Sequence, residues 1–294
     1  MLNTERPSQE HAGLDEYPVP KLVGTLIADQ FQAVAAVQAA AGAIAAAVEA
    51  AVPRIAAGGR LIYVGAGTSG RLGVLDGVEL HPTFSWPHER ALSLLAGGKR
   101  AMFAAVEGAE DDAKQGFLDL AALLPQRDDV VLLLAASGST PYVLGALDAA
   151  RTAGALTIGI ANNAEAPLAT RAELGITLDT GPEVISGSTR LKAGTSQKIV
   201  LNTISSAIMV RLNKVHGNLM VDMKATNAKL LRRAVALTMH ATGADEPSAR
   251  FVLEQCDHHV KVAIVVLLRQ VPVARARQLL AQAHGSVRSA LLLQ

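Results

Sequence analysis

The chain has 294 residues, of which 50% are hydrophobic, 3% aromatic and 18% charged. This length and apolar content are enough for one large or two modest domains with a real core, and they exclude a disordered chain. Lys and Arg number 27 against 26 Asp and Glu, so the net charge is +1. A nucleic-acid partner is therefore not expected, because proteins that bind nucleic acid usually carry a basic excess.

The cysteine count and the hydrophobic runs indicate where the protein works. The single cysteine, Cys256, excludes an internal disulfide and fits a reducing compartment. The first 20 residues contain no apolar stretch typical of a secretory signal. The longest apolar runs, near Val130–Ala136 and Ala263–Leu268, are far shorter than the roughly 20 residues of a membrane-spanning helix. We expect a cytoplasmic protein that does not associate with a membrane.

The first two thirds of the chain alternate between predicted strands and helices. Residues 1–30 predict an irregular arm leading into a short helix, and the alanine-rich stretch 31–57 predicts one long helix ending at Gly58-Gly59. Helices are expected between most strands, for example over Lys99–Val106 and Pro141–Thr152. Strand and helix in alternation predict an α/β fold with a parallel sheet. The predicted buried strands are Arg60–Gly65, Leu92–Leu95, Val130–Leu134, Leu156–Ile160 and Leu174–Leu178.

The last third is predicted to be helical. A long amphipathic helix is expected over Lys192–Asn213, and another helical stretch from Asn227. Four short helices follow Gly243, and they indicate a small all-α appendix with its own apolar faces. We therefore divide the chain into an arm with the alanine-rich helix (1–58), an α/β domain (59–240) and a helical tail (241–294). The four short helices are Pro247–Cys256, His259–Leu268, Val273–Ala283 and Val287–Leu292.

Two loops rich in glycine and hydroxyl groups follow the first and third predicted strands. Gly65–Gly70 fits the G-x-G-x-x-G pattern, but no acidic residue ends the second strand to bind a ribose, so dinucleotide binding is disfavoured. Thr68 and Ser69 instead suit a phosphate monoester, or simply cap a tight turn. Ser137, Ser139 and Thr140 precede Pro141, which is typical of a helix start. Because both loops follow strands of one sheet, they should converge on one anion, and a phosphorylated small molecule is the expected ligand.

Charged residues after these loops are candidates for further roles. Glu79 lies just before a proline that should end its helix, and Glu110 lies in an acidic cluster after the second strand. Each could also be a solvated or capping acid. Arg190 stands just before a long helix, an unfavourable place for a cation, so an anionic ligand or an ion pair is expected there. His258 and His259 lack the spacing of a metal site, and no metal is expected.

Long blocks of the sequence resemble the N-acetylmuramic acid 6-phosphate etherase family over about residues 20–290. The resemblance implies a sugar-isomerase (SIS) fold, in which a five-stranded parallel sheet lies between helices, with a small C-terminal tail like a ubiquitin-associated domain. It also implies a homodimer, a role in peptidoglycan recycling, and no cofactor. The matching blocks are Gly65–Asp76, Glu79 with Pro82-Thr83, Glu107–Asp111, Ser137–Val143, Gly187–Thr195 and Lys214–Asp222.

The resemblance also assigns roles to individual residues. The substrate opens to its aldehyde, Glu110 removes the C2 proton, and Glu79 protonates the departing D-lactate and then handles the incoming water. Two carboxyl groups in opposite protonation states can do this without a metal. Thr68, Ser69, Ser137, Ser139 and Thr140 would hold the phosphate. Thr189 and Arg190 would contact the sugar or the lactyl carboxylate.

The chain departs from the family pattern at two places, and two other functions share the scaffold. Leu80 and His81 replace family residues beside Glu79, so His81 either shifts the working pH or faces solvent. Ser139 replaces a common arginine, which would weaken phosphate binding or loosen a structural contact. An aldose–ketose isomerase would also remove a C2 proton but keep the C3 substituent. A non-catalytic sugar-phosphate sensor would release no product, and the related regulatory proteins are longer.

Overall fold

The computed structural model describes residues 2–223 and 228–294 of the chain. These residues form two compact units. The first unit contains Met1–Val78 and His88–Ser205, and the second contains Glu79–Pro87 and Ser206–Gln294. Asn227, the first residue of a predicted helical stretch, lies outside the described residues. The described part of that stretch is α9 (Ala228–Thr242).

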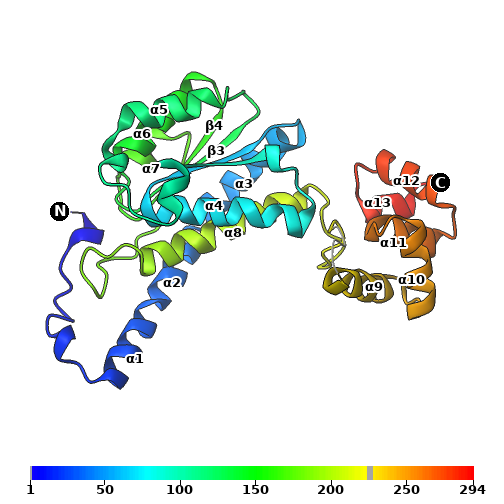
Figure 1. The fold of residues 1–294 in the computed structure, drawn as a ribbon, viewed down its shortest axis with the longest axis horizontal. Coiled ribbons are helices and arrows are strands. Elements are labelled where there is room, and N and C mark those ends of the chain that lie inside the picture. The colour runs from blue at the N-terminus through cyan, green and yellow to red at the C-terminus, as the bar shows by residue number, and fades with distance from the viewer. Residues whose placement is uncertain (1, 224–227) are drawn as a thin grey trace. The chain divides into compact units, whose positions relative to one another are not determined.

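The first unit is built on a five-stranded parallel sheet, which confirms the predicted α/β fold (Figure 1). The strands stand in the order β2-β1-β3-β4-β5, so the chain forms β2 on one side of β1 and then crosses to the other side of β1 to form β3, β4 and β5. In such sheets the reversal of strand order opens a crevice at the carboxyl ends, where ligands bind. The strands are β1 (Leu61–Gly65), β2 (Ala91–Leu95), β3 (Val130–Ala135), β4 (Leu156–Ala161) and β5 (Leu174–Thr177).

Helices cover both faces of this sheet (Figure 1). Every residue of β1, β3 and β4 is therefore buried, whichever face its side chain points to. Ile62 and Val64 pack with α5 (Ala113–Ala122), α6 (Pro141–Thr152) and α7 (Pro167–Arg171). Tyr63 points to the other face, where its hydroxyl donates to Asp76 of α4 (Gly67–Phe84) at 2.8 Å. Asp76 also accepts from Asn202 of α8 (Lys192–Arg211), so α4 and α8 are joined beneath the sheet.

The N-terminal region differs from the single alanine-rich helix that we predicted, and that prediction is wrong. After α1 (Val19–Asp29), the chain forms α2 (Phe31–Ala39) and α3 (Ala41–Ala56), with Ala40 outside helical geometry between them. The direction changes by 55° at this break. Helix α3 packs against β3, β4 and β5 and buries Ile44 and Ile55, so the sheet dictates its direction, whereas α2 buries only the small residues Ala33 and Ala36. Within the described part of the chain no single helix is long and apolar enough to cross a membrane, and only the bent pair meets the length and composition criteria.

Two further local predictions are wrong. The helix expected over Lys99–Val106 is only the short 3-10 helix Gly98–Met102, because Gly97 and Gly98 adopt φ of +83° and +64° and turn the chain sharply. Pro82 does not end α4, which continues to Phe84. Pro82 stands in the last turn of α4, where it removes the backbone N–H that would otherwise donate to the carbonyl of Val78.

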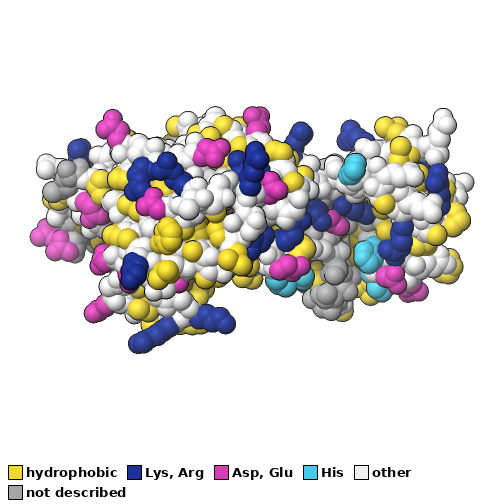
Figure 2. Space-filling view, turned by 90° about the horizontal axis from the view of Figure 1, so that it is seen from above, with side chains coloured by type: hydrophobic (Ala, Val, Ile, Leu, Met, Phe, Trp, Pro, Cys, Tyr) yellow, Lys and Arg dark blue, Asp and Glu magenta, His cyan; other side chains and the backbone are white. Residues whose placement is uncertain are grey.

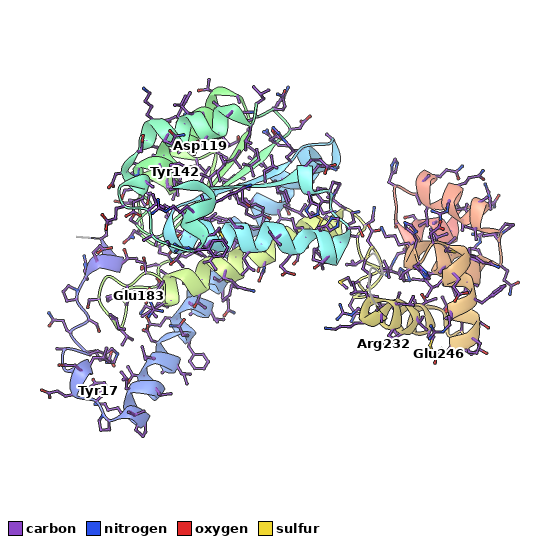
Figure 3. All side chains as sticks on the ribbon, viewed as in Figure 1. Tyr17, Asp119, Tyr142, Glu183, Arg232 and Glu246 are labelled. Carbon is purple, nitrogen blue, oxygen red and sulfur yellow. The ribbon has the colours of Figure 1, made fainter. Side chains whose placement is uncertain are left out.

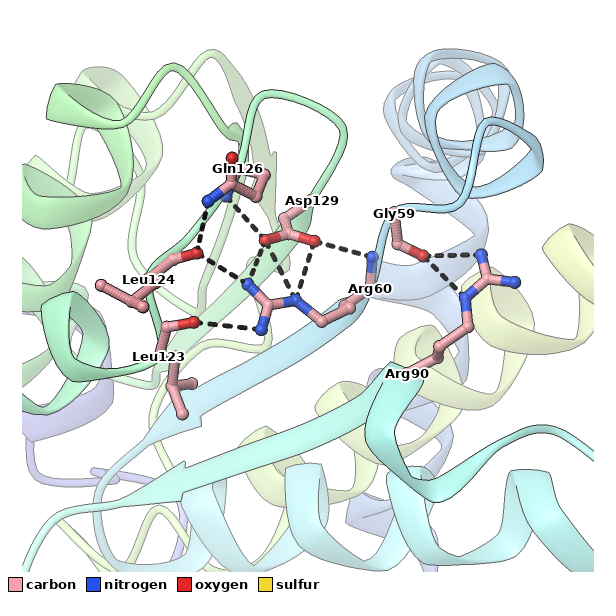
Figure 4. A network of polar contacts seen from close by, with 7 residues as sticks. All are labelled: Gly59, Arg60, Arg90, Leu123, Leu124, Gln126 and Asp129. Carbon is pink, nitrogen blue, oxygen red and sulfur yellow. Dashed lines mark hydrogen bonds and ion pairs between the residues drawn. The ribbon is translucent and has the colours of Figure 1, made fainter.

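A buried ion pair joins the amino ends of β1 and β3 (Figure 4). The carboxylate of Asp129 accepts from the backbone N–H of Arg60 at 2.8 Å and from the Arg60 Nη2 at 2.6 Å. The Arg60 guanidinium also donates to the carbonyl groups of Leu123 and Leu124, and the backbone N–H of Gln126 donates to Asp129. This network fixes the two central strands at the edge opposite their carboxyl ends.

The second unit is all-α and has its own apolar core, as predicted for the C-terminal tail. Its core brings together Val235, Leu253, Ile264 and Leu279 from four different helices. The likeness to a ubiquitin-associated domain stays a prediction. The helices are α9 (Ala228–Thr242), α10 (Glu246–Gln255), α11 (Val260–Arg269), α12 (Val273–Gln282) and α13 (Val287–Leu292).

Candidate functional site

A polar cavity of about 380 Å³ opens at the carboxyl ends of β1 and β3, at the point where the strand order reverses. Seven of the predicted phosphate, sugar and catalytic residues line it, and all belong to the first unit. The loop chemistry of the sequence predicts a ligand site at this edge of the sheet. The seven residues are Thr68, Ser69, Glu110, Ser137, Ser139, Thr140 and Thr189.

The loop after β1 is shaped by close backbone packing. A side chain at Gly70 would place its Cβ 2.4 Å from Leu95 Cδ1 and 2.6 Å from the Gly65 carbonyl oxygen, so only glycine fits. Helix α4 therefore starts at Gly67, immediately after the strand. Its first turn carries Thr68 and Ser69 into the cavity lining. Hydroxyl groups at a helix N-terminus favour an anion.

The loop after β3 is also shaped by close packing around a glycine. Gly138 adopts φ of +71°, and a Cβ there would lie 2.3 Å from the Ala166 Cβ. The backbone N–H of Ser139 donates to the Ser137 hydroxyl at 3.2 Å. Thr140 occupies the N-cap position of α6, but its side chain makes no capping hydrogen bond, so the simple capping interpretation of its hydroxyl does not hold. Two helix N-termini with hydroxyl groups thus line one cavity.

The charges that line the cavity are acidic. Glu110 and Asp111 come from the 3-10 helix Ala109–Asp111, and Glu5 comes from the N-terminal arm. No Lys or Arg is found among the described residues of the lining. A phosphate group in this cavity would therefore be held by hydroxyl groups and by the N-termini of α4 and α6, with carboxylates free to move protons.

Glu5 is a lining residue that the sequence did not predict. The arm is held by Thr4, whose backbone N–H donates to Asn163 Oδ1 at 3.3 Å and whose hydroxyl accepts from Asn163 Nδ2 at 3.0 Å. Asn163 follows β4, and the backbone N–H of Ser8 donates to Ser186 Oγ. An irregular arm has no periodicity to predict its course, so only the fold could place Glu5 here.

Glu79 and Arg190 are not among the residues that line this cavity. Glu79 belongs to the second unit, where it is exposed in the last turns of α4. His81 is half-buried there, and its Nδ1 lies 2.9 Å from the Trp86 carbonyl oxygen, so that nitrogen carries the proton and donates. Arg190 is exposed in the turn before α8, and no ion-pair partner is found for it among the described residues.

Two buried charged residues fix the start of α8: Glu183 (Figure 3) and Lys192. The sequence did not predict this structural role for either residue. Both oxygens of Glu183 accept backbone N–H groups at the helix start, from Lys192 at 3.1 Å and Ala193 at 2.9 Å. Burial raises the pKa of Glu183, and the two N–H groups offset only part of that rise. Lys192 Nζ donates to Asp29 Oδ1 at 2.7 Å and to Gln32 Oε1 at 2.8 Å. These contacts fix the turn that presents Thr189.

Acidic and basic side chains are interspersed on the face drawn in Figure 2. Within residues 2–223 and 228–294, no three His, Cys, Asp or Glu side chains gather as metal ligands would.

Family models match the chain over most of its α/β part. Residues 43–151 match the N-terminal SIS domain of glucokinase regulatory protein, and residues 102–207 match the SIS domain. A solved structure from Bacteroides fragilis, described as a phosphosugar isomerase involved in capsule formation, shares the fold. It has a TM-score of 0.50 at 21% identity and covers 68% of this chain and 98% of its own.

Curated relatives match nearly the whole chain. The N-acetylmuramic acid 6-phosphate etherase of Deinococcus radiodurans is 57% identical over 98% of this chain and 94% of its own length. The etherase of Pectobacterium atrosepticum is 55% identical over 85% of this chain and 82% of its own. That of Salmonella dublin is 47% identical over 99% and 98%. Because the identity to these relatives extends over nearly the whole chain, and the chain has an SIS-type sheet, it belongs to the N-acetylmuramic acid 6-phosphate etherase family.

Proposed function

We propose that the chain cleaves the lactyl ether of N-acetylmuramic acid 6-phosphate, as a carbon–oxygen lyase of the sugar-phosphate class. The net reaction consumes one water molecule, and the products are D-lactate and N-acetylglucosamine 6-phosphate. One observation carries the proposal: hydroxyl-bearing loops after β1 and β3 line one cavity with Glu110, in a chain that is similar to etherases over almost its full length.

The phosphate end of the substrate is assigned to the two loops. Thr68, Ser69, Ser137 and Thr140 supply hydroxyl groups, and the N-termini of α4 and α6 supply a favourable field for an anion. Ser139, in place of the common family arginine, adds a hydroxyl group without a positive charge. Because no cation lines the cavity among the described residues, binding depends on the number and placement of these hydrogen bonds.

The base step is assigned to Glu110. In the open-chain form, the aldehyde makes the C2 proton acidic, and the carboxylate of Glu110 removes it. Elimination then breaks the C3–oxygen bond, and the electron pair leaves with the lactyl oxygen. A carboxylate at the cavity wall is suited to this step because it needs only a positioned base.

The acid step is assigned to Glu79 on the family resemblance. Glu79 would give a proton to the departing lactate oxygen and then take one from the water that adds at C3. Thr189 is assigned to the sugar, and Arg190 to the sugar or the lactyl carboxylate. Of these three residues, Thr189 lines the cavity. No metal or cofactor is needed in this sequence of steps.

The function is tested by incubating the purified protein with N-acetylmuramic acid 6-phosphate. We expect D-lactate and N-acetylglucosamine 6-phosphate in equal amounts. An isomerase would consume the aldose without releasing lactate, and a sensor would bind the sugar and change nothing. Absence of both products would contradict the proposal.

We further propose that the chain works as a homodimer. An apolar stripe of exposed side chains runs along α1 and α2 at helical spacing, which is a face that proteins usually cover. A second copy of the chain would bury it, and Phe31→Lys should then shift the mass measured by light scattering from dimer to monomer. The stripe contains Val19 (70% exposed), Val23 (48%), Ile27 (60%), Phe31 (73%) and Val34 (53%).

A cytoplasmic location also remains our proposal. Cys256 is a buried free thiol, and burial raises its pKa to about 11, which keeps it protonated and unreactive. A place in peptidoglycan recycling follows from the proposed substrate. Cell fractionation with an antibody to the protein would test the location.

A further inference from the structure

The Lys214–Asp222 block matched the family, yet no step of the proposed reaction uses it. In the second unit, both ends of this block line a cavity of about 460 Å³, together with Lys261 of α11. Ser85, His259 and His284 complete its polar lining. The cavity has the volume of a small-molecule site.

Two ammonium groups in this cavity share a single carboxylate oxygen. Lys214 Nζ lies 2.6 Å from Asp222 Oδ2, and Lys261 Nζ lies 3.0 Å from the same atom. No other Asp or Glu is found among the described residues of the lining. Two positive charges therefore face one negative charge, even with both histidines neutral.

This excess charge is only partly exposed to water. The Lys261 side chain is 11% exposed, and that of Lys214 is 22% exposed. Burial lowers the pKa of Lys261, and the neighbouring Lys214 lowers it further, against the opposing effect of Asp222. An anion that enters the cavity would supply a second negative charge. Its attraction would offset both the burial of the ammonium groups and the repulsion between them.

We propose that this cavity binds a small oxyanion, a phosphate ester or a carboxylate, with Lys214 and Lys261 as its cationic contacts. The ammonium groups act as point charges with several donors each, which suits either oxyanion. Its lining shares no residue with the cavity of the first unit, and the proposal does not depend on the etherase activity.

Trp86 provides a local reporter for binding. It is the chain's single tryptophan, it is 3% exposed, and Lys214 Nζ lies 5.8 Å from its ring centroid. An anion that draws Lys214 away from the ring should change the tryptophan emission. We would titrate the full-length protein with inorganic phosphate and, in a second arm, with D-lactate, holding ionic strength constant with chloride. A saturable change with either anion supports the proposal and identifies its chemistry.

Three single variants test whether the paired lysines hold the anion. Lys261→Met keeps the aliphatic stem and should weaken binding by about tenfold or more. Asp222→Asn removes the competing carboxylate and should tighten binding, a gain that misfolding cannot imitate. Lys229→Met, an exposed lysine of α9, should leave binding unchanged.

A double variant, Thr68→Val with Ser137→Ala, should keep the tryptophan response, because those hydroxyl groups belong to the other cavity. The proposal is overturned if chloride alone gives the same change, if neither anion gives one, or if Lys261→Met responds like the unmodified protein. Weaker binding in a folded Asp222→Asn variant would also contradict it.

Discussion

Asp129→Asn should destabilise the sheet that carries the proposed site, because it breaks the ion pair between β1 and β3 (Figure 4). Asp129 is 1% exposed, and its carboxylate accepts backbone N–H groups from Arg60 and Gln126 as well as the Arg60 guanidinium. An asparagine can accept at one oxygen only, and its amide nitrogen would face a donor. Removing one partner of a buried pair costs about 3–5 kcal/mol. The Arg60 side chain is 23% exposed and can recover some hydration, so we expect about 3 kcal/mol.

The assay is thermal unfolding followed by circular dichroism. A loss of about 3 kcal/mol corresponds to a fall in Tm of roughly 6–12 °C for a unit of this size. The control is Asp128→Asn at the neighbouring, exposed acid, which should change the Tm little.

The pH dependence gives a second test of the same ion pair. Burial alone would raise the pKa of Asp129, but the hydrogen bonds from Arg60 and Gln126 outweigh it and hold that pKa below its usual value. A carboxyl group of this kind stabilises the fold fully above its unfolded pKa of about 3.9 and loses that contribution as pH falls through its folded pKa. The gap in stability between the unmodified protein and Asp129→Asn should therefore be full at neutral pH and narrow below about pH 4. A gap below about 1 kcal/mol at neutral pH, or one that persists unchanged in acid, would refute the reasoning.

Three further predictions concern the first-unit cavity. Glu110→Gln should lower kcat by about 10²–10⁴ and stop exchange of the C2 hydrogen with solvent, and exchange that persists while lactate release is lost would mean that another group is the base. Glu5→Gln should raise KM for the sugar phosphate by about tenfold with a smaller change in kcat, if the arm's carboxylate accepts a hydrogen bond from the sugar. Glu16→Gln on the same arm is its control, and equal effects of the two would show that arm charge alone matters. Gly138→Ala should abolish phosphate binding, measured by calorimetry with inorganic phosphate, because the added Cβ would meet the Ala166 Cβ at 2.3 Å and displace the loop; normal binding would show that this loop does not hold the anion.

Much of the α/β architecture follows from local features of the sequence. Short apolar runs such as Val130–Leu134 indicate buried strands when helices separate them. In a parallel sheet the loops that follow the strands all lie at the edge where the strands have their carboxyl ends. The glycines and hydroxyl groups of Gly65–Gly70 and Ser137–Pro141 therefore predicted a ligand site at this edge, where the polar cavity of the first unit lies. The acidic cluster after the second strand made Glu110 a candidate, the family resemblance assigned it the role of base, and the cavity of the first unit includes it.

Other features were decided by tertiary structure, because they depend on contacts between residues far apart in the chain. The break at Ala40 arises where α3 packs on the sheet, and alanine-rich sequence has no local signal for it. Glu5 reaches the cavity through Thr4 and Asn163, which are separated by 159 residues. Lys192 is paired with Asp29 in the same way, although its position at a helix start would by itself be unfavourable. Periodicity and turn chemistry act over a few residues, whereas an irregular arm and a buried ion pair are positioned only by the packed fold.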